Sequence, residues 1–233
     1  MSSTNALNWT VAPGGIPTGT VRVPGDKSIS HRSVMLGSLA EGITDVTGFL
    51  DGEDCLCTMK AFQAMGVRIE RLSDTSLRIH GVGLHGLKAP LQALDLGNSG
   101  TSMRLMSGLL AAQTFETTLV GDASLSKRPM RRVTDPLLRM GAHIESNEGK
   151  APLHIHPVER LQAISHVSKV ASAQVKSCIL LAGLYADGRT EVHEPETSRD
   201  HTERMLQAFG VKVETGPGLA AVSGGQKLVG TSI

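Results

Sequence analysis

Apolar residues recur at helical spacing in three segments of the chain, and each of these segments opens with a polar turn. The first apolar face includes Ile29, Leu36 and Leu39, and the other two cover residues 105–112 and 178–185. Burying the apolar part of each helix leaves its polar first turn open to a polar ligand. The pattern therefore predicts three helices with buried tails and accessible N-terminal turns.

Each of the three polar turns also carries a cation. Arg32, Arg104 and Lys176 occupy corresponding positions, since 104 − 32 and 176 − 104 are both 72. Ser28 is a candidate N-cap of the first helix, which follows the strand breaker Pro24-Gly25. Free backbone N–H groups and a nearby cation favour an anion at a helix start. An ordinary capped helix with solvated charges is the alternative interpretation.

A second recurring pattern indicates that the chain consists of three similar units. Met65-Gly66, Met140-Gly141 and Phe209-Gly210 each end an amphipathic helix, at intervals of 75 (140 − 65) and 69 (209 − 140) residues. Glycine suits the left-handed conformation that ends many helices. Two alternating strands follow each glycine, and a short strand lies between the two helices of each unit. Each unit is therefore predicted to be β-α-β-α-β-β, with residues 19–23 as the first strand.

These patterns predict an α/β fold in which three βαβαββ units place their apolar helices inside and their sheets outside. We expect a loose lead-in over residues 1–18, one lobe over 19–224 and a crossover segment over 225–233, toward a second lobe. The approximate boundaries of the three repeats within the lobe are 19–85, 86–157 and 158–224.

Composition argues against two classes of function. With 23 basic and 22 acidic residues the net charge is +1, so no global field would attract nucleic acid or a membrane surface. Six aromatic residues are too few for a base-stacking platform. The sequence shows neither a secretory signal nor a long apolar run, and three cysteines cannot form a disulfide framework. We therefore expect a cytoplasmic protein.

Two loops add further candidates for anion binding. Arg128, in the basic loop 124–132, is followed by proline and is expected to point in a fixed direction, where it would bind a carboxylate or phosphate with both arms. A solvated basic face is the alternative. Arg199 is expected to point toward the same cleft. Asp54 and Asp200 are expected to cap the helices that follow them.

The sequence predicts no metal site. Cys55 and Cys57 lack a second pair at zinc spacing. His154 and His156 share one face of a predicted strand, but no third ligand is evident, so both are expected to face solvent.

Five motifs carry a closer resemblance to a known family. They are GDKS at 25–28, GNSGT at 97–101, KRP at 127–129, SAQVK at 172–176 and RDHTE at 199–203. From about Thr20 to Gly224 the chain resembles the N-terminal half of the 5-enolpyruvylshikimate-3-phosphate synthase (3-phosphoshikimate 1-carboxyvinyltransferase) family, in its class II bacterial branch. The resemblance implies one lobe of an inverse α/β barrel. It also implies transfer of enolpyruvyl from phosphoenolpyruvate to shikimate 3-phosphate, a transferase step of aromatic amino acid biosynthesis, without metal or cofactor.

The resemblance also assigns residues to the two substrates. Seven would bind shikimate 3-phosphate: Lys27, Ser28, Arg32, Ser172, Ala173, Gln174 and Arg199. Five would bind phosphoenolpyruvate or the inhibitor glyphosate: Lys27, Asn98, Gly100, Arg128 and Gln174. Lys27 reaches both substrates and is the catalytic candidate. Further carboxylates and cations would come from the C-terminal lobe, so this half is expected to bind shikimate 3-phosphate without turnover.

Two positions depart from the family pattern, and two other functions remain open. Leu105 stands where many relatives have proline, and Gly100 stands where glyphosate-tolerant class II enzymes have alanine, which implies sensitivity to glyphosate. A UDP-N-acetylglucosamine enolpyruvyl transferase would show asparagine after the first lysine, whereas Ser28 follows Lys27 here. A non-catalytic domain that binds a phosphorylated metabolite or a partner protein is the remaining alternative.

Overall fold

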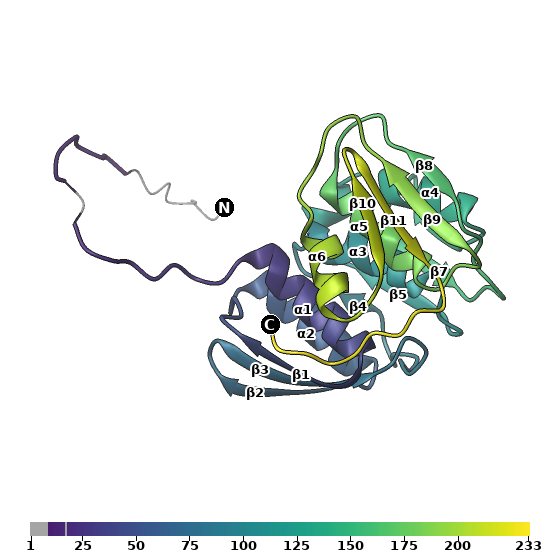
Figure 1. Cartoon of the computed structure of the whole chain (residues 1–233), viewed down its shortest axis with the longest axis horizontal. Helices are drawn as coiled ribbons and strands as arrows, with labels where there is room; N and C mark the ends of the chain where they lie inside the picture. The colour runs from purple at the N-terminus through teal and green to yellow at the C-terminus, as the bar shows by residue number, and fades with distance from the viewer. Residues whose placement is uncertain (1–8, 17) are drawn as a thin grey trace, which may run out of the picture.

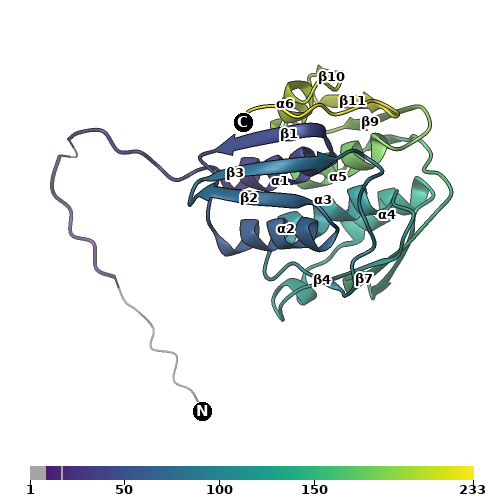
Figure 2. The same cartoon turned by 90° about the horizontal axis from the view of Figure 1, so that it is seen from below.

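Helices lie inside the molecule and three small sheets lie outside it (Figure 1, Figure 2). The structure is a computed structural model, and it describes residues 9–16 and 18–233. The expected lead-in over 1–18 falls partly outside these residues. Residues 9–16 and 18–26 form neither helix nor strand.

The first unit forms a three-stranded antiparallel sheet with the strand order β1-β3-β2. Its two helices pack against one face of this sheet (Figure 2). The elements of the unit are α1 (Lys27–Leu39), β1 (Glu41–Thr47), α2 (Glu53–Ala64), β2 (Arg68–Ser73) and β3 (Ser76–Val82).

The second and third units share one topology, with strand orders β4-β5-β7-β6 and β8-β9-β11-β10. In each sheet the first pair is parallel and the other pairs are antiparallel. The second unit consists of β4 (Leu94–Asp95), α3 (Gly100–Leu110), β5 (Thr117–Val120), the short 3₁₀ helix η1 (Leu125–Lys127), α4 (Arg131–Arg139), β6 (His143–Asn147) and β7 (Lys150–His156). The third consists of β8 (Ser165–Val167), α5 (Ala173–Gly183), β9 (Arg189–His193), α6 (His201–Ala208), β10 (Val213–Gly216) and β11 (Leu219–Ser223). The predicted βαβαββ order is confirmed for these two units.

The first unit lacks the strand that was predicted over residues 19–23. Val21 and Val23 alternate as a strand would, but both are largely exposed and no neighbouring strand pairs with them. Alternation alone was misleading here, because a strand forms only where a partner satisfies its backbone groups.

The C-terminal segment occupies the corresponding place beside β1. It runs parallel to β1, with the Glu41 N–H donating to the Leu228 carbonyl at 2.8 Å and the Ile233 N–H donating to the Asp45 carbonyl at 2.9 Å. In the second and third units the parallel neighbour at this place is the first strand, β4 or β8. The last residues of the chain thus complete the edge of the first sheet.

The three repeated glycines end their helices as predicted. Gly66, Gly141 and Gly210 have φ values of +89°, +89° and +86°. A side chain is strained in this left-handed region, so glycine ends each helix at low cost and turns the chain into the next strand.

The core is formed by the apolar stretches of α1, α3 and α5. These helices are buried on nearly all sides, and α3 packs closely against α5. A Cβ atom on Gly108 would lie 2.1 Å from the Cys178 carbonyl oxygen, so only glycine allows the two backbones to approach this closely. The predicted arrangement, helices inside and sheets outside, is confirmed. Among the described helices, none has both the length and the apolar character needed to span a bilayer.

Candidate active site

The N-terminal turns of α1, α3 and α5 meet at one small cavity of about 20 Å³. Seven residues line it: Ser28, Arg32, Thr101, Ala173, Gln174, Arg199 and His201. A volume of this size holds about one water molecule, so a larger ligand would lie mainly in front of the opening. The structure thus brings together side chains from all three repeats at the polar helix starts.

Arg32 is the most constrained cation of this group, with only 5% of its surface exposed. Its Nε donates to Thr202 Oγ1 at 2.6 Å, its Nη1 to the Ser28 carbonyl at 2.9 Å and its Nη2 to Ser177 Oγ at 2.7 Å. Burial lowers the pKa of Arg32 to about 10, which leaves the guanidinium charged at neutral pH. A fixed, buried positive charge therefore stands behind the cavity.

Gln174 and Arg104 link the starts of α5 and α3. Arg104 Nη1 donates to Gln174 Oε1 at 2.9 Å, and Gln174 Nε2 donates to Thr101 Oγ1 at 3.0 Å. Burial and the neighbouring Arg128 and Arg132 lower the pKa of Arg104. Several cations are thus crowded on this side of the site, which favours an anionic ligand.

Lys176 differs from the other two aligned cations. It is buried between two glutamates, with its Nζ 3.0 Å from Glu194 Oε2 and 2.7 Å from Glu203 Oε1. Burial alone would lower the pKa of Lys176, but hydrogen bonds to both carboxylates outweigh it and the pKa is raised. Lys176 therefore pairs inside the protein, and its charge is not directed at the helix-start cavity as that of Arg32 is.

Glu194 connects this ion triad to two proposed binding elements. Its Oε1 accepts from the Ser172 N–H at 2.7 Å, and its Oε2 accepts from the Ser198 hydroxyl at 2.7 Å. Ser172 is the N-cap of α5 and Ser198 precedes Arg199. The buried triad thus fixes the start of α5 against the loop that carries Arg199.

Lys27 lies at the first position of α1 but faces a different cavity. It forms an ion pair with Asp54, and these two residues with Leu50, Gly52, Glu53 and Cys55 line a pocket of about 270 Å³. Half of the Lys27 side chain is exposed. The structure therefore places Lys27 beside the helix-start cavity and does not bring it together with Arg32.

Two of the three cap predictions are corrected by this geometry, and the third is confirmed in position only. Asp26, and not Ser28, is the N-cap of α1, since its carboxylate accepts from the Ile29 N–H at 2.8 Å. Gly52 occupies the cap position of α2, and Asp54 pairs with Lys27 instead. Asp200 is the N-cap residue of α6 as predicted, but its carboxylate accepts a hydrogen bond from Arg204 and none from the helix backbone. The sequence does not show whether a carboxylate near a helix start accepts from the helix backbone, as Asp26 does, or from a basic side chain, as Asp54 and Asp200 do.

The loop before α3 holds Arg128 in place. Asn98 Oδ1 accepts from Arg128 Nη2, and Asn98 Nδ2 donates to Asp122 Oδ2 at 2.7 Å. The hydrogen bond from Asn98 holds the pKa of Asp122 below its ordinary value. A Cβ on Gly100 would lie 3.0 Å from Arg128 Nη1. Gly100, Asn98 and Arg128 are therefore neighbours, as a shared ligand site requires.

The structure adds residues that the sequence did not single out. Thr101 and His201 line the cavity. They lie in the family motifs GNSGT and RDHTE, which could have marked them as candidates. Glu203 also stands in one of these motifs, whereas Asp122 and Glu194 act only through hydrogen bonds and ion pairs with residues far away in sequence. No local pattern marks such partners.

A polar chain joins the first two helix starts behind the cavity. His31 Nδ1 lies 2.8 Å from Thr58 Oγ1, which lies 2.6 Å from Ser102 Oγ, and Ser102 Oγ lies 2.6 Å from the Oγ of Ser99, the N-cap of α3. Burial, followed by the charge of Lys27, lowers the pKa of His31 to about 4. His31 is therefore neutral at physiological pH and acts as a structural hydrogen-bonding group.

The fold and the converging helix starts define one lobe of an enolpyruvyl transferase. The family model described as EPSP synthase (3-phosphoshikimate 1-carboxyvinyltransferase) matches residues 11–233, and the chain belongs to this family.

The proteins that this chain resembles are about twice as long as the chain itself. The 3-phosphoshikimate 1-carboxyvinyltransferase of Methylococcus capsulatus is 64% identical over 226 residues, which cover 97% of this chain and 52% of the relative. That of Hydrogenovibrio crunogenus is 63% identical, with 91% and 48% covered. The structure of EPSP synthase from Acinetobacter baumannii superposes with a TM-score of 0.90 at 58% identity, over 92% of this chain and 49% of that chain. The chain thus spans about half the length of the curated relatives it matches.

The buried neutral His31 makes stability depend on pH. Its pKa is about 4 when folded and about 6.5 when unfolded, so the unfolded chain binds more protons between these values and stability falls as the pH falls from about 6.5 to 4. The loss due to this residue is about 3 kcal/mol. Urea unfolding over this pH range should show a smaller loss for His31→Gln than for the unmodified chain. Parallel curves for the two proteins would contradict this role.

Proposed function

We propose that the starts of α1, α3 and α5 bind shikimate 3-phosphate. The observation that carries this proposal is the cavity that gathers Ser28, Arg32, Ala173, Gln174 and Arg199, five of the seven residues expected for this substrate. The sixth, Ser172, precedes Ala173 and caps the same helix. Lys27 completes the set from the adjacent pocket.

The charges and donors at the site suit a phosphorylated, hydroxylated acid. Arg199 is exposed, and its Nη1 lies 3.5 Å from Ser28 Oγ, so both could contact one anionic group. The start of α5 adds backbone N–H groups at the positive end of its dipole. Arg32, buried behind these groups, contributes a fixed positive potential without losing its own hydrogen bonds.

We propose a neighbouring place for phosphoenolpyruvate, at Lys27, Asn98, Gly100, Arg128 and Gln174. The hydrogen bond from Arg128 to Asn98 holds the guanidinium beside Gly100. An arginine fixed in direction suits bidentate binding of a carboxylate or phosphate. Gln174 lines the helix-start cavity and accepts a hydrogen bond from Arg104. It therefore stands between the two proposed substrate places.

The reaction proposed for the assembled enzyme is transfer of enolpyruvyl from phosphoenolpyruvate to the 5-hydroxyl of shikimate 3-phosphate, by addition and then elimination of phosphate. This lobe contributes positioning and positive charge, and Lys27 is its catalytic candidate. The long relatives contain a second half that this chain does not align with, and we propose that it supplies the remaining groups.

The same proposal covers domain organisation and location. We propose that the three units lie within residues 19–224 and that the segment 225–233, although part of it pairs with β1, is the crossover toward the second lobe. The three cysteines are free, as suits the reducing cytoplasm.

Titration calorimetry with shikimate 3-phosphate tests the proposed site. Arg199→Ala should weaken binding more than tenfold, because a charge-assisted contact contributes roughly 1.5–3 kcal/mol. Arg32→Ala should weaken it at least as much, provided circular dichroism shows that the variant is folded. Arg204→Ala is the matched control, since this exposed arginine on α6 pairs with Asp200 and lies outside the helix-start cavity.

Two results would contradict the proposal. Binding that Arg204→Ala weakens and Arg199→Ala does not would place the ligand in the larger pocket of about 420 Å³ between α6 and the β10–β11 hairpin. Steady product formation by the purified 233-residue chain alone would show that no second half is needed.

Gly100→Ala should reduce inhibition by glyphosate. The added methyl group would lie 2.8 Å from Arg104 Nη1 and 3.0 Å from Arg128 Nη1, so the ends of these two arginine side chains must shift, beside the place proposed for the inhibitor. If the shifted guanidinium groups lose about 1.4 kcal/mol of contact with the inhibitor, the inhibitory concentration rises about tenfold. The measurement is inhibition of an active enzyme that carries this chain as its first half. Equal inhibition of the two forms would refute the idea.

A further inference from the structure

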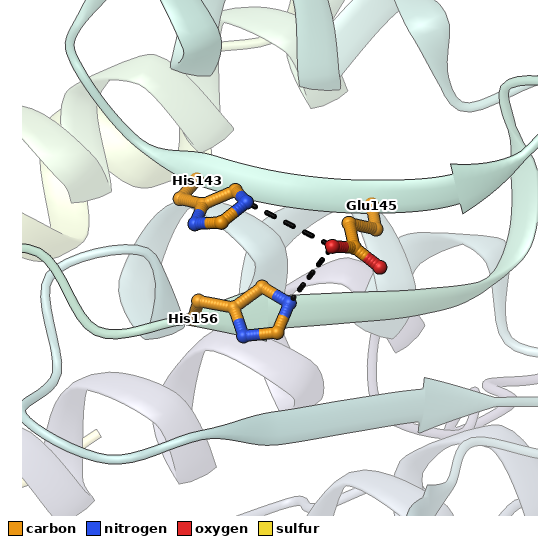
Figure 3. A group of neighbouring side chains, drawn as sticks. All are labelled: His143, Glu145 and His156. Atoms are coloured by element: carbon orange, nitrogen blue, oxygen red, sulfur yellow. Dashed lines mark ion pairs between the residues drawn. The ribbon is translucent and has the colours of Figure 1, made fainter.

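The outer face of the second sheet carries a cluster that the proposed function does not use. His143 and Glu145 stand on β6, and His156 stands on β7 (Figure 3). Strand alternation turns Ile144 and Ile155 into the core and these three side chains outward. The cluster is therefore on the side of the sheet that faces away from the helices.

Strand register brings the three residues together. His143 is directly opposite His156 in the antiparallel pair, and Glu145 is the next residue of β6 on the same face. Because neighbouring side chains on one face of a sheet lie within contact distance, this register builds a three-residue group from two strands. Residues 143 and 156 are thirteen positions apart (156 − 143), which is no recognised metal-binding spacing.

The ligand atoms have nearly the separations of a metal site. Glu145 Oε1 lies 3.9 Å from His143 Nε2 and 3.5 Å from His156 Nε2, and one ligand atom of each residue lies within 4.8 Å of the others. Figure 3 shows the carboxylate reaching toward both imidazole rings. In a tetrahedral zinc site with bonds of about 2.0–2.1 Å, the ligand atoms are about 3.4 Å apart. Small side-chain rotations would therefore bring these three ligand atoms to the separations that zinc requires.

The hydrogen bonds of His156 provide a second, independent indication. Its Nδ1 lies 2.9 Å from Glu116 Oε1, the arrangement in which a carboxylate orients a metal-binding histidine through its other nitrogen. Its Nε2 is buried and has no hydrogen-bond partner among the residues that the structure describes. With the proton on Nδ1, the lone pair of Nε2 points toward the Glu145 carboxylate, and a cation between them would satisfy both.

We propose that His143, Glu145 and His156 bind one divalent transition-metal ion of the zinc type. Two imidazole nitrogens and one carboxylate are a ligand set that Zn²⁺ accepts, whereas Mg²⁺ prefers oxygen ligands alone. His143 and Glu145 are exposed, so water has access to the fourth position. The ion would join β6, the edge strand of its sheet, to β7 and so stabilise this hairpin.

Calorimetry on protein without a histidine tag tests the site with Zn²⁺ and Mg²⁺ as probes. We expect one Zn²⁺ per chain and no binding of Mg²⁺. His143→Ala and His156→Ala should each weaken Zn²⁺ binding more than tenfold, and Glu116→Gln should weaken it about tenfold, as loss of an orienting carboxylate does. Because the metal would bind only the folded hairpin, Zn²⁺ should also raise the melting temperature of the unmodified chain and not that of His143→Ala.

His154→Ala and Cys57→Ser are the matched controls. His154 stands on the same outer face but hydrogen-bonds Thr118, and Cys57 is a partly exposed thiol on α2. Both variants should bind Zn²⁺ like the unmodified chain. The proposal is overturned if the folded chain takes up no Zn²⁺, if His143→Ala binds it unchanged, or if either control variant loses it. In that case the contacts of His156 with Glu116 and Glu145 are ordinary ion pairs at the protein surface.

Discussion

The close packing of α1, α3 and α5 is the constraint on which the rest of the structure depends. These helices are buried on nearly all sides, and α3 and α5 approach so closely that a Cβ on Gly108 would overlap the Cys178 carbonyl. Apolar surface along the helices supplies the driving force for this packing. Because each helix has a polar first turn, packing the three tails together also brings the three starts together. The candidate active site is thus a consequence of how the core is assembled.

Burying polar groups at the helix starts requires that they satisfy one another. Arg32 donates to groups on α1, α5 and α6, and Lys176 is held by two glutamates. Removing one partner would leave an unpaired buried charge, which is far more costly than the pair is favourable. These networks therefore fix the relative positions of the helix starts before any ligand arrives, and such preorganisation favours binding. Glu194 extends the same order to the loop before Arg199.

Most of the fold was predictable from the sequence, because its signals are local. The 3.6-residue period marked the helices, and the repeated glycines at 66, 141 and 210 marked their ends. Apart from the caps of α1 and α2, the errors concern long-range partners. A strand over 19–23 would have needed a neighbour, and the alignment of Lys176 with Arg32 and Arg104 did not reveal its partners Glu194 and Glu203. Five residues assigned from motifs do line one cavity, although Lys27 faces the adjacent pocket. The sequence did not reveal that His143 and Glu145 lie beside His156, because strand register brings these residues together.

The most direct test of the central claim is a crystal structure of the chain with shikimate 3-phosphate bound. If the packed helix starts form the binding site, density for the ligand will lie at the opening between Ser28, Gln174 and Arg199, in front of the buried Arg32. Density in the larger pocket between α6 and the β10–β11 hairpin, with the helix starts free, would contradict the account.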